Sequence, residues 1–131
     1  MSLPRILVVL MLLAPGAQAA QVHVTAGVDS LQTAIAGSAP GDVLILGPGT
    51  YAGPVTIDHA VAIEGGGQAV IDGNFKGTVI TITGDDVTLR GLTVTHSGRR
   101  NEDIDAGIKI KKGAHRALIE GNRVVDNMHG I

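Results

Sequence analysis

A short pattern recurs three times along the chain, and it constrains the fold more than any other feature. Each copy is a run of alternating apolar residues that ends in glycine: VAIEG at 61–65, VTLRG at 87–91 and ALIEG at 117–121. The copies begin 26 and 30 residues apart. A period of this length is typical of proteins built from repeated units, each of which packs mainly against its neighbours.

Two further series of short apolar runs keep the same order around this pattern. One precedes it, at 55–57, 80–82 and 108–110, with Ile131 beginning a fourth copy, and the other follows it, at 70–71, 92–94 and 122–124. Each repeat is therefore expected to hold three short strands separated by glycine-rich corners. At Gly91 the alternation slips by one residue, because a chain that turns a corner needs backbone angles that glycine permits.

This arrangement predicts an all-β fold, a right-handed single-stranded parallel β-helix with three short strands per coil and a short N-terminal capping helix. The alternative is an antiparallel sandwich of hairpins, although hairpins do not require three registers that recur in a constant order. Composition favours a thin interior of aliphatic side chains, because Tyr51 and Phe75 are the only aromatic residues in a chain that is 44% hydrophobic.

The first twenty residues resemble an export signal. Arg5 precedes an apolar run that is too short to span a bilayer, and AQA at 17–19 is a small-residue cleavage pattern, so residues 1–20 are expected to be removed near Ala19. An uncleaved membrane anchor is the alternative. The chain has no cysteine, so its stability outside the cytoplasm is expected to come from packing and backbone pairing.

Residues 21–42 are expected to form an N-terminal cap, and residues 43–131 the coils. Asp29 or Ser30 can begin a short helix with an apolar face of Leu31, Ala34 and Ile35. At the other end, Gly130 and Ile131 begin a new coil that no capping element follows. We therefore expect this chain to be the N-terminal part of a longer protein, with its coils truncated at the C-terminus.

The longest interruption of the repeat, THSGRRNEDIDAG at 95–107, is the main candidate for a functional loop. Glu102, Asp103 and Asp105 offer carboxylates for glycoside hydrolysis or for holding Ca²⁺ during β-elimination of an acidic sugar. Arg99 and Arg100 can face a uronate carboxylate or a protein partner. A solvated loop of mixed charge remains an alternative.

Copper binding is a second hypothesis, with His96, Met128 and His129 as candidate ligands, since imidazole and thioether suit Cu(I). The five histidines show no close ligand spacing, and adjacent residues on a strand point to opposite faces. Scattered surface histidines are the alternative.

A third hypothesis is a docking scaffold, because stacked coils offer long flat faces to protein partners. Lys109, Lys111 and Lys112 lie near the acidic loop and could form a patch for such a partner. This basic cluster is short and lacks interleaved aromatic residues, so it does not indicate a nucleic-acid surface. Asn122 and Asn127 are expected to have a structural role at tight corners, where asparagine bonds its own backbone or stacks in a ladder.

Several motifs in order resemble the start of the NosD family of nitrous oxide reductase maturation proteins. They are PGDVL, PGTYAGPV, VIDG, DVTLRGLTV, DAGI and EGNRVVDN, which follow the export signal and cover nearly the whole mature chain. The resemblance implies a right-handed parallel β-helix with repeats of the carbohydrate-binding and sugar-hydrolase type.

The same resemblance implies a periplasmic protein that docks with an ABC transporter permease and its ATPase, peripheral to the membrane. Together with a copper chaperone they would support assembly of the copper–sulfur cluster of nitrous oxide reductase. The resemblance assigns no catalytic or cofactor-binding residue, so the protein is expected not to be an enzyme. A carbohydrate-active β-helix, either a polysaccharide lyase or hydrolase or a binding module, is the alternative.

Overall fold

The computed structural model of the chain describes residues 19–131, so the expected leader lies outside the described residues except for its last two positions. The described part is mostly β, with one short helix. In chain order its elements are β1 (Gln21–Val24), α2 (Ser30–Gly37), β2 (Asp42–Leu46), β3 (Gly49–Ala52), β4 (Val55–Ile57), β5 (Val61–Asp72), β6 (Ile80–Ile82), β7 (Thr88–Thr95), β8 (Ile108–Ile110), β9 (Leu118–Glu120) and β10 (Arg123–Val125). No helix in residues 19–131 is long and apolar enough to cross a membrane.

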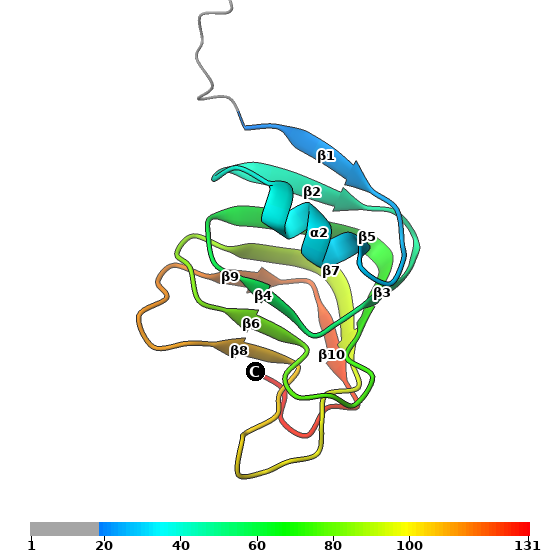
Figure 1. Cartoon of the computed structure of the whole chain (residues 1–131), viewed down its shortest axis with the longest axis vertical. Coiled ribbons are helices and arrows are strands. Elements are labelled where there is room, and N and C mark those ends of the chain that lie inside the picture. The colour runs from blue at the N-terminus through cyan, green and yellow to red at the C-terminus, as the bar shows by residue number, and fades with distance from the viewer. Residues whose placement is uncertain (1–18) are drawn as a thin grey trace, which may run out of the picture.

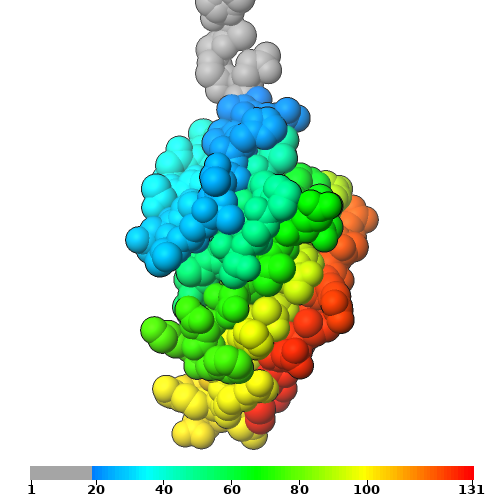
Figure 2. Space-filling model, turned by 90° about the vertical axis from the view of Figure 1, so that its right-hand side faces the viewer, coloured from blue at the N-terminus to red at the C-terminus, as the bar shows by residue number. Residues whose placement is uncertain are grey.

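The strands form two sheets in which neighbours run parallel. The larger sheet has the order β1-β2-β5-β7-β10, with β3 on β5 and β9 on β7, and the smaller sheet has the order β4-β6-β8 (Figure 1). Ile63 lies opposite Leu89, which in turn lies opposite Ile119. The three copies of the repeat therefore stack on one another, as expected, and the antiparallel alternative is wrong. Figure 2 shows the successive turns as slanted bands that follow one another from blue to red.

In two of the three repeats the glycine corner bends a strand instead of ending it, which corrects the expectation of three separate strands in every coil. β5 and β7 each run through their glycine, and their register shifts between Glu64 and Ala69. Gly91 has a φ of +63°, in the left-handed region that glycine occupies without strain. In the third repeat the corresponding stretch is divided into two strands, β9 and β10, on either side of Gly121.

The interior between the two sheets is aliphatic, as the composition predicted. Isoleucine, leucine and valine side chains from successive coils are buried there together with a single aromatic residue, Tyr51. The Tyr51 hydroxyl donates to the carbonyl oxygens of Val24 and Gly47, at 2.9 and 2.7 Å. Burial raises the pKa of this hydroxyl.

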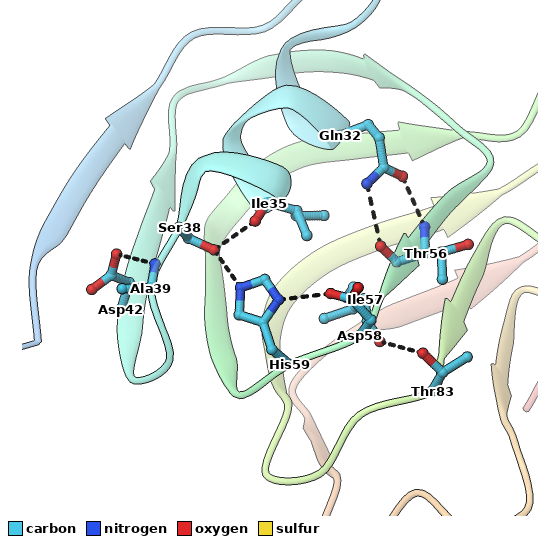
Figure 3. Close-up of polar contacts among 10 residues, drawn as sticks. All are labelled: Gln32, Ile35, Ser38, Ala39, Asp42, Thr56, Ile57, Asp58, His59 and Thr83. Carbon is cyan, nitrogen blue, oxygen red and sulfur yellow. Dashed lines mark hydrogen bonds and ion pairs between the residues drawn. The ribbon is translucent and has the colours of Figure 1, made fainter.

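Helix α2 covers the N-terminal end of this interior with Leu31 and Ile35, and it packs against β1, β3 and β4. Asp29 is the N-cap residue, but its side chain makes no capping hydrogen bond. The Gln32 amide instead reaches the edge of the smaller sheet, where it accepts from the Thr56 backbone N–H at 2.9 Å and donates to the Thr56 carbonyl at 3.3 Å (Figure 3). A side chain thus replaces the next strand at this edge, which blunts a site of unwanted strand pairing.

The C-terminal end of α2 is tied to the turn that follows β4. Ser38 Oγ lies 2.8 Å from His59 Nε2, and His59 Nδ1 lies 2.7 Å from Asp58 Oδ1 (Figure 3). This hydrogen bond from His59 lowers the pKa of Asp58. Within the expected cap, β1 pairs in parallel with β2, so the backbone pairing of the coils continues into residues 21–42.

Candidate functional site

The candidate site is built on one corner of the stack, where three successive turns lie over one another. The backbone N–H of Phe75 donates to the His96 carbonyl at 2.8 Å, and the N–H of His96 donates to the Asp126 carbonyl at 3.2 Å. All three residues have a left-handed backbone, with φ of 60°, 63° and 55°. Such angles are uncommon outside glycine, and this hydrogen-bond column holds the three side chains at a common corner.

His96 is the centre of this corner. Its Nδ1 lies 3.2 Å from Asp72 Oδ1, which also accepts the backbone N–H of Asn74 at 2.9 Å. The imidazole stacks on the Phe75 ring with the centroids 4.5 Å apart and the planes inclined by 28°. The Asp72 carboxylate and the Phe75 ring therefore define the orientation of the imidazole.

Arg99 extends this cluster from the loop that follows β7. Its guanidinium carbon lies 5.4 Å from the centre of the Phe75 ring, which is within the range of a cation–π contact. Among the described residues Arg99 forms no ion pair, whereas the neighbouring Arg100 pairs with Asp103. We call Asp72, Phe75, His96 and Arg99 the corner cluster.

An open hollow of about 220 Å³ adjoins the corner cluster. It is lined by Gly27, Val28, Thr50, Ala52, Asp72 and Asn74. Thr50, Ala52 and Asp72 come from β3 and β5, while the loop before α2 and the turn after β5 supply the others. Hydroxyl and carboxylate oxygens thus lie beside small apolar groups, within the same region as an aromatic ring and an unpaired cation.

The rest of the loop at 95–107 is held by its own residues. Asp105 is buried, and its Oδ2 accepts the backbone N–H of Arg100 at 2.9 Å. Gly98 packs so tightly against this carboxylate that a side chain there would overlap it. Asp105 therefore supports the base of the loop, while Glu102 and Asp103 are exposed and the Asp103 carbonyl accepts from the Lys109 ammonium at 3.0 Å.

The three candidate copper ligands each contact a different residue, and none of the recorded contacts joins two of them. Met128 donates its backbone N–H to Ser97 Oγ at 2.8 Å, and His129 Nε2 lies 3.1 Å from Asn101 Oδ1. Neither contact involves His96, which faces Asp72. Residues 19–131 contain no group of three or more histidine, aspartate or glutamate side chains placed to hold a metal ion, so copper binding stays a prediction.

Other charged residues form ladders between coils, away from the hollow. Arg90 pairs with Glu120 at 2.6 Å and with Glu64 at 2.9 Å, and these two hydrogen bonds raise the pKa of Arg90. Arg116 pairs with Asp86 at 2.7 Å, which lowers the pKa of the Asp86 carboxyl. Exposed pairs of this kind stabilise a fold only slightly, and their repetition from coil to coil indicates a structural role.

Analysis of the sequence selected His96 and Arg99 but missed Asp72 and Phe75, which contact His96 directly. Asp72 is the last residue of β5, and nothing in the sequence around it distinguishes it from the other aspartates. Phe75 carried a usable signal, because it is one of two aromatic residues and lies in the polar turn DGNFKG. Its partner His96 lies 21 residues further along the chain, so the two residues come into contact only when the coils stack.

No family model matches the chain. In sequence, 59% of the chain is 34% identical, over 77 residues, to a Pseudomonas aeruginosa protein described as a probable ABC transporter binding protein, NosD. The chain spans only 18% of the length of that relative.

In structure, the chain is similar to the PL6 family alginate lyase AlyGC, with a TM-score of 0.64 and 27% sequence identity. The match covers 79% of this chain and 15% of that one. This likeness to an enzyme contradicts the expectation that the protein is not an enzyme, which rested on a resemblance that assigns no catalytic residues. Taken together, the two likenesses support a parallel β-helix family for this chain, which is a broader group than the NosD family.

Proposed function

We propose that the chain contributes the first coils of an exported, NosD-like accessory protein that docks with an ABC transporter. In this proposal the leader is cleaved near Ala19, and the coils form a right-handed parallel β-helix with three faces per turn in the periplasm. The transporter's permease and ATPase, together with a copper chaperone, would be its partners during assembly of the copper cluster of nitrous oxide reductase. The observation that carries the proposal is the 77-residue match to a protein described as an ABC transporter binding protein.

The loop at 97–105 is the docking element that the geometry favours. It carries the exposed Ile104 side chain and the unpaired Arg99, while the buried Asp105 holds its base. An apolar side chain beside a cation on a supported loop suits recognition of a protein surface. Arg100 and Asp103, which pair with each other, would help to hold the loop in this shape.

Co-purification of the chain with the transporter tests this proposal. We expect a tagged chain to retain the detergent-solubilised permease and ATPase, and Ile104→Asp to abolish that retention. Arg116→Gln, which removes an exposed charge at another corner, is the matched control and should retain both proteins. Retention by Ile104→Asp equal to that of the unchanged chain would exclude the loop as the docking element.

A carbohydrate-active β-helix is the second candidate, and the structural likeness to an alginate lyase favours it. The hollow is lined by Thr50, with its hydroxyl, and by Asp72, with its carboxylate, and the adjoining corner cluster adds the Arg99 guanidinium. Groups of these kinds recognise acidic sugars. Incubation of the chain with alginate and other acidic polysaccharides, followed by measurement of retained polymer and of released oligosaccharides, tests this candidate. Neither retention nor release from any of these polymers would argue against it.

A further inference from the structure

Asp72 is the only ionisable residue among those that line the hollow. Its Oδ1 accepts the Asn74 N–H at 2.9 Å and lies 3.2 Å from His96 Nδ1, whereas no donor within residues 19–131 contacts its Oδ2. A neutral imidazole makes the second contact by donating its Nδ1–H, which leaves the carboxylate with its negative charge. No lysine or arginine of the described chain forms an ion pair with Asp72, so the hollow presents a carboxylate with one unused oxygen.

The remaining walls of the hollow are largely apolar, and backbone hydrogen bonds hold them in place. Gly27, Val28 and Ala52 line it with small apolar groups. The Ala52 N–H donates to the Gly27 carbonyl at 3.4 Å, which ties the loop before α2 to the end of β3, and the Gly53 N–H donates to the Asp72 carbonyl at 2.8 Å. In Figure 2 the loop before α2 (blue) and the turn after β5 (green) project from the same side of the stack.

A primary ammonium group on a short aliphatic chain fits these features. Its methylene groups can lie against the apolar walls, and its three N–H donors match the oxygens of Asp72, Thr50 and Asn74, which also line the hollow. A guanidinium fits less well, because Oδ1 of Asp72 is already engaged and a bidentate pair needs both carboxylate oxygens. A volume of about 220 Å³ is below the roughly 300–1,000 Å³ of pockets for drug-sized ligands, so it suits a group the size of one side chain.

We infer that this hollow is a binding site for a primary ammonium group on a short aliphatic chain, with Asp72 Oδ2 as its counter-ion. Two sources carry such a group: the lysine side chain of a protein partner and a free small amine. The inference goes beyond both functions proposed above and depends on neither of them.

An NMR titration of the isotopically labelled chain tests the site, because it detects weak binding and shows which backbone amides are affected. One arm uses pentylamine and the other a glycine-lysine-glycine tripeptide with blocked ends, at about pH 7.5, where a primary amine is protonated. We expect both probes to shift the amide signals of Thr50 and Asn74. Pentanol and the corresponding norleucine tripeptide keep the aliphatic chain without the charge, and they should bind about tenfold more weakly or less.

Three variants of the chain separate the roles of charge and shape. Asp72→Asn keeps the shape of the side chain and removes its charge, so it should weaken the binding of both amine probes by about tenfold. Glu102→Gln removes an exposed carboxylate outside the hollow and is the matched control, which should bind like the unchanged chain. Ala52→Leu fills the hollow from β3 and should abolish binding while Asp72 stays in place, so the inference remains testable if Asp72→Asn disturbs the turn after β5.

The outcomes distinguish the two sources and decide the inference. Binding of the lysine tripeptide at least as tight as that of pentylamine would support a protein partner, and binding of pentylamine alone would support a free amine. Equal binding of charged and neutral probes, or equal binding by Asp72→Asn and the unchanged chain, would overturn the inference. An arginine tripeptide that binds more tightly than the lysine tripeptide, or binding that persists in a folded Ala52→Leu variant, would overturn it as well.

Discussion

Single side chains complete the hydrogen bonding of the coils where the backbone cannot. Asn122 accepts the Leu92 N–H at 2.9 Å and donates to the Leu89 carbonyl at 2.9 Å, so its amide spans the bend of β7 around Gly91. Asn127 does the same for Ser97 and Val94 in the next corner. The sequence predicted a structural role for both residues, and they fulfil it chiefly by bonding to the coil before them.

Removal of the Asn122 amide should therefore be costly. We expect Asn122→Ala to lower the free energy of unfolding by about 1–3 kcal/mol, because it leaves a backbone N–H and a carbonyl without partners. Urea denaturation followed by circular dichroism measures this loss. Asn101→Ala, on the exposed loop, is the control and should change stability by less than about 0.5 kcal/mol. Equal effects of the two substitutions would contradict a bridging role for Asn122.

Asp42 is expected to make stability depend on pH. Hydrogen bonds from the backbone N–H groups of Ala20 and Ala39 lower the pKa of its carboxyl below the reference value of 3.8. The carboxylate therefore stabilises the fold above that reference value, and this contribution is lost as the pH falls through the lowered pKa.

Asp42→Asn should accordingly be less stable than the unchanged chain at pH 7, and the difference should shrink as the pH falls below about 4. Urea midpoints measured from pH 7 to pH 3 give the comparison. Asp29→Asn is the control, because Asp29 makes no capping bond through its side chain. A constant difference between Asp42→Asn and the unchanged chain across this range would exclude the proposed linkage.

At the scale of elements, the bend is what shapes the larger sheet. β5 pairs with β7 on both sides of the glycine corner, and between these two paired stretches residues 65–68 of β5 lie opposite the single residue Gly91. This bulge turns the chain while the pairing resumes at Ala69. The pattern in the sequence located the corner correctly, but alternation alone does not distinguish a bent strand from two separate strands.

The close approach of β5 to β7 at this corner leads to a prediction for Gly65. A Cβ atom there would lie 2.5 Å from the Gly91 carbonyl oxygen and 2.6 Å from Leu92 Cδ2, so Gly65→Ala should cost about 1–3 kcal/mol. The thermal unfolding midpoint measures the effect. Gly37→Ala, where an added Cβ meets nothing within 4 Å, should leave the midpoint nearly unchanged or raise it slightly. An unchanged midpoint for Gly65→Ala would show that the corner can widen at little cost.

At the scale of the whole molecule, the same strand register aligns apolar side chains in the interior and charged side chains on the exterior. Ile63, Leu89 and Ile119 stack toward the inside, while the next residue in each strand contributes to the Glu64–Arg90–Glu120 ladder on the outside. Burial of apolar surface is the main source of stability in such a stack, and exposed ion pairs add little.

Leu89 and Arg90 test this division because they are adjacent and face opposite sides of β7. Leu89→Ala should lower the free energy of unfolding by about 2–5 kcal/mol, since Leu89 is fully buried among stacked neighbours. Arg90→Gln should change it by less than about 1 kcal/mol despite the loss of two ion pairs. Chemical denaturation of both variants measures the difference, and a larger loss for Arg90→Gln would reverse the assignment.

The repeat by itself determined which residues face the interior and which strands stack. Apolar alternation is local, and its recurrence in one order along the chain leaves parallel stacking as the arrangement that buries every copy on one side. Only the tertiary structure decided that Asp72 and Phe75 contact His96, that Arg99 lies over the Phe75 ring, and that Asp72 also lines a hollow. Those contacts depend on how each turn lies over the next, and the lengths and backbone angles of the connecting loops, which follow no repeat in the sequence, set that alignment.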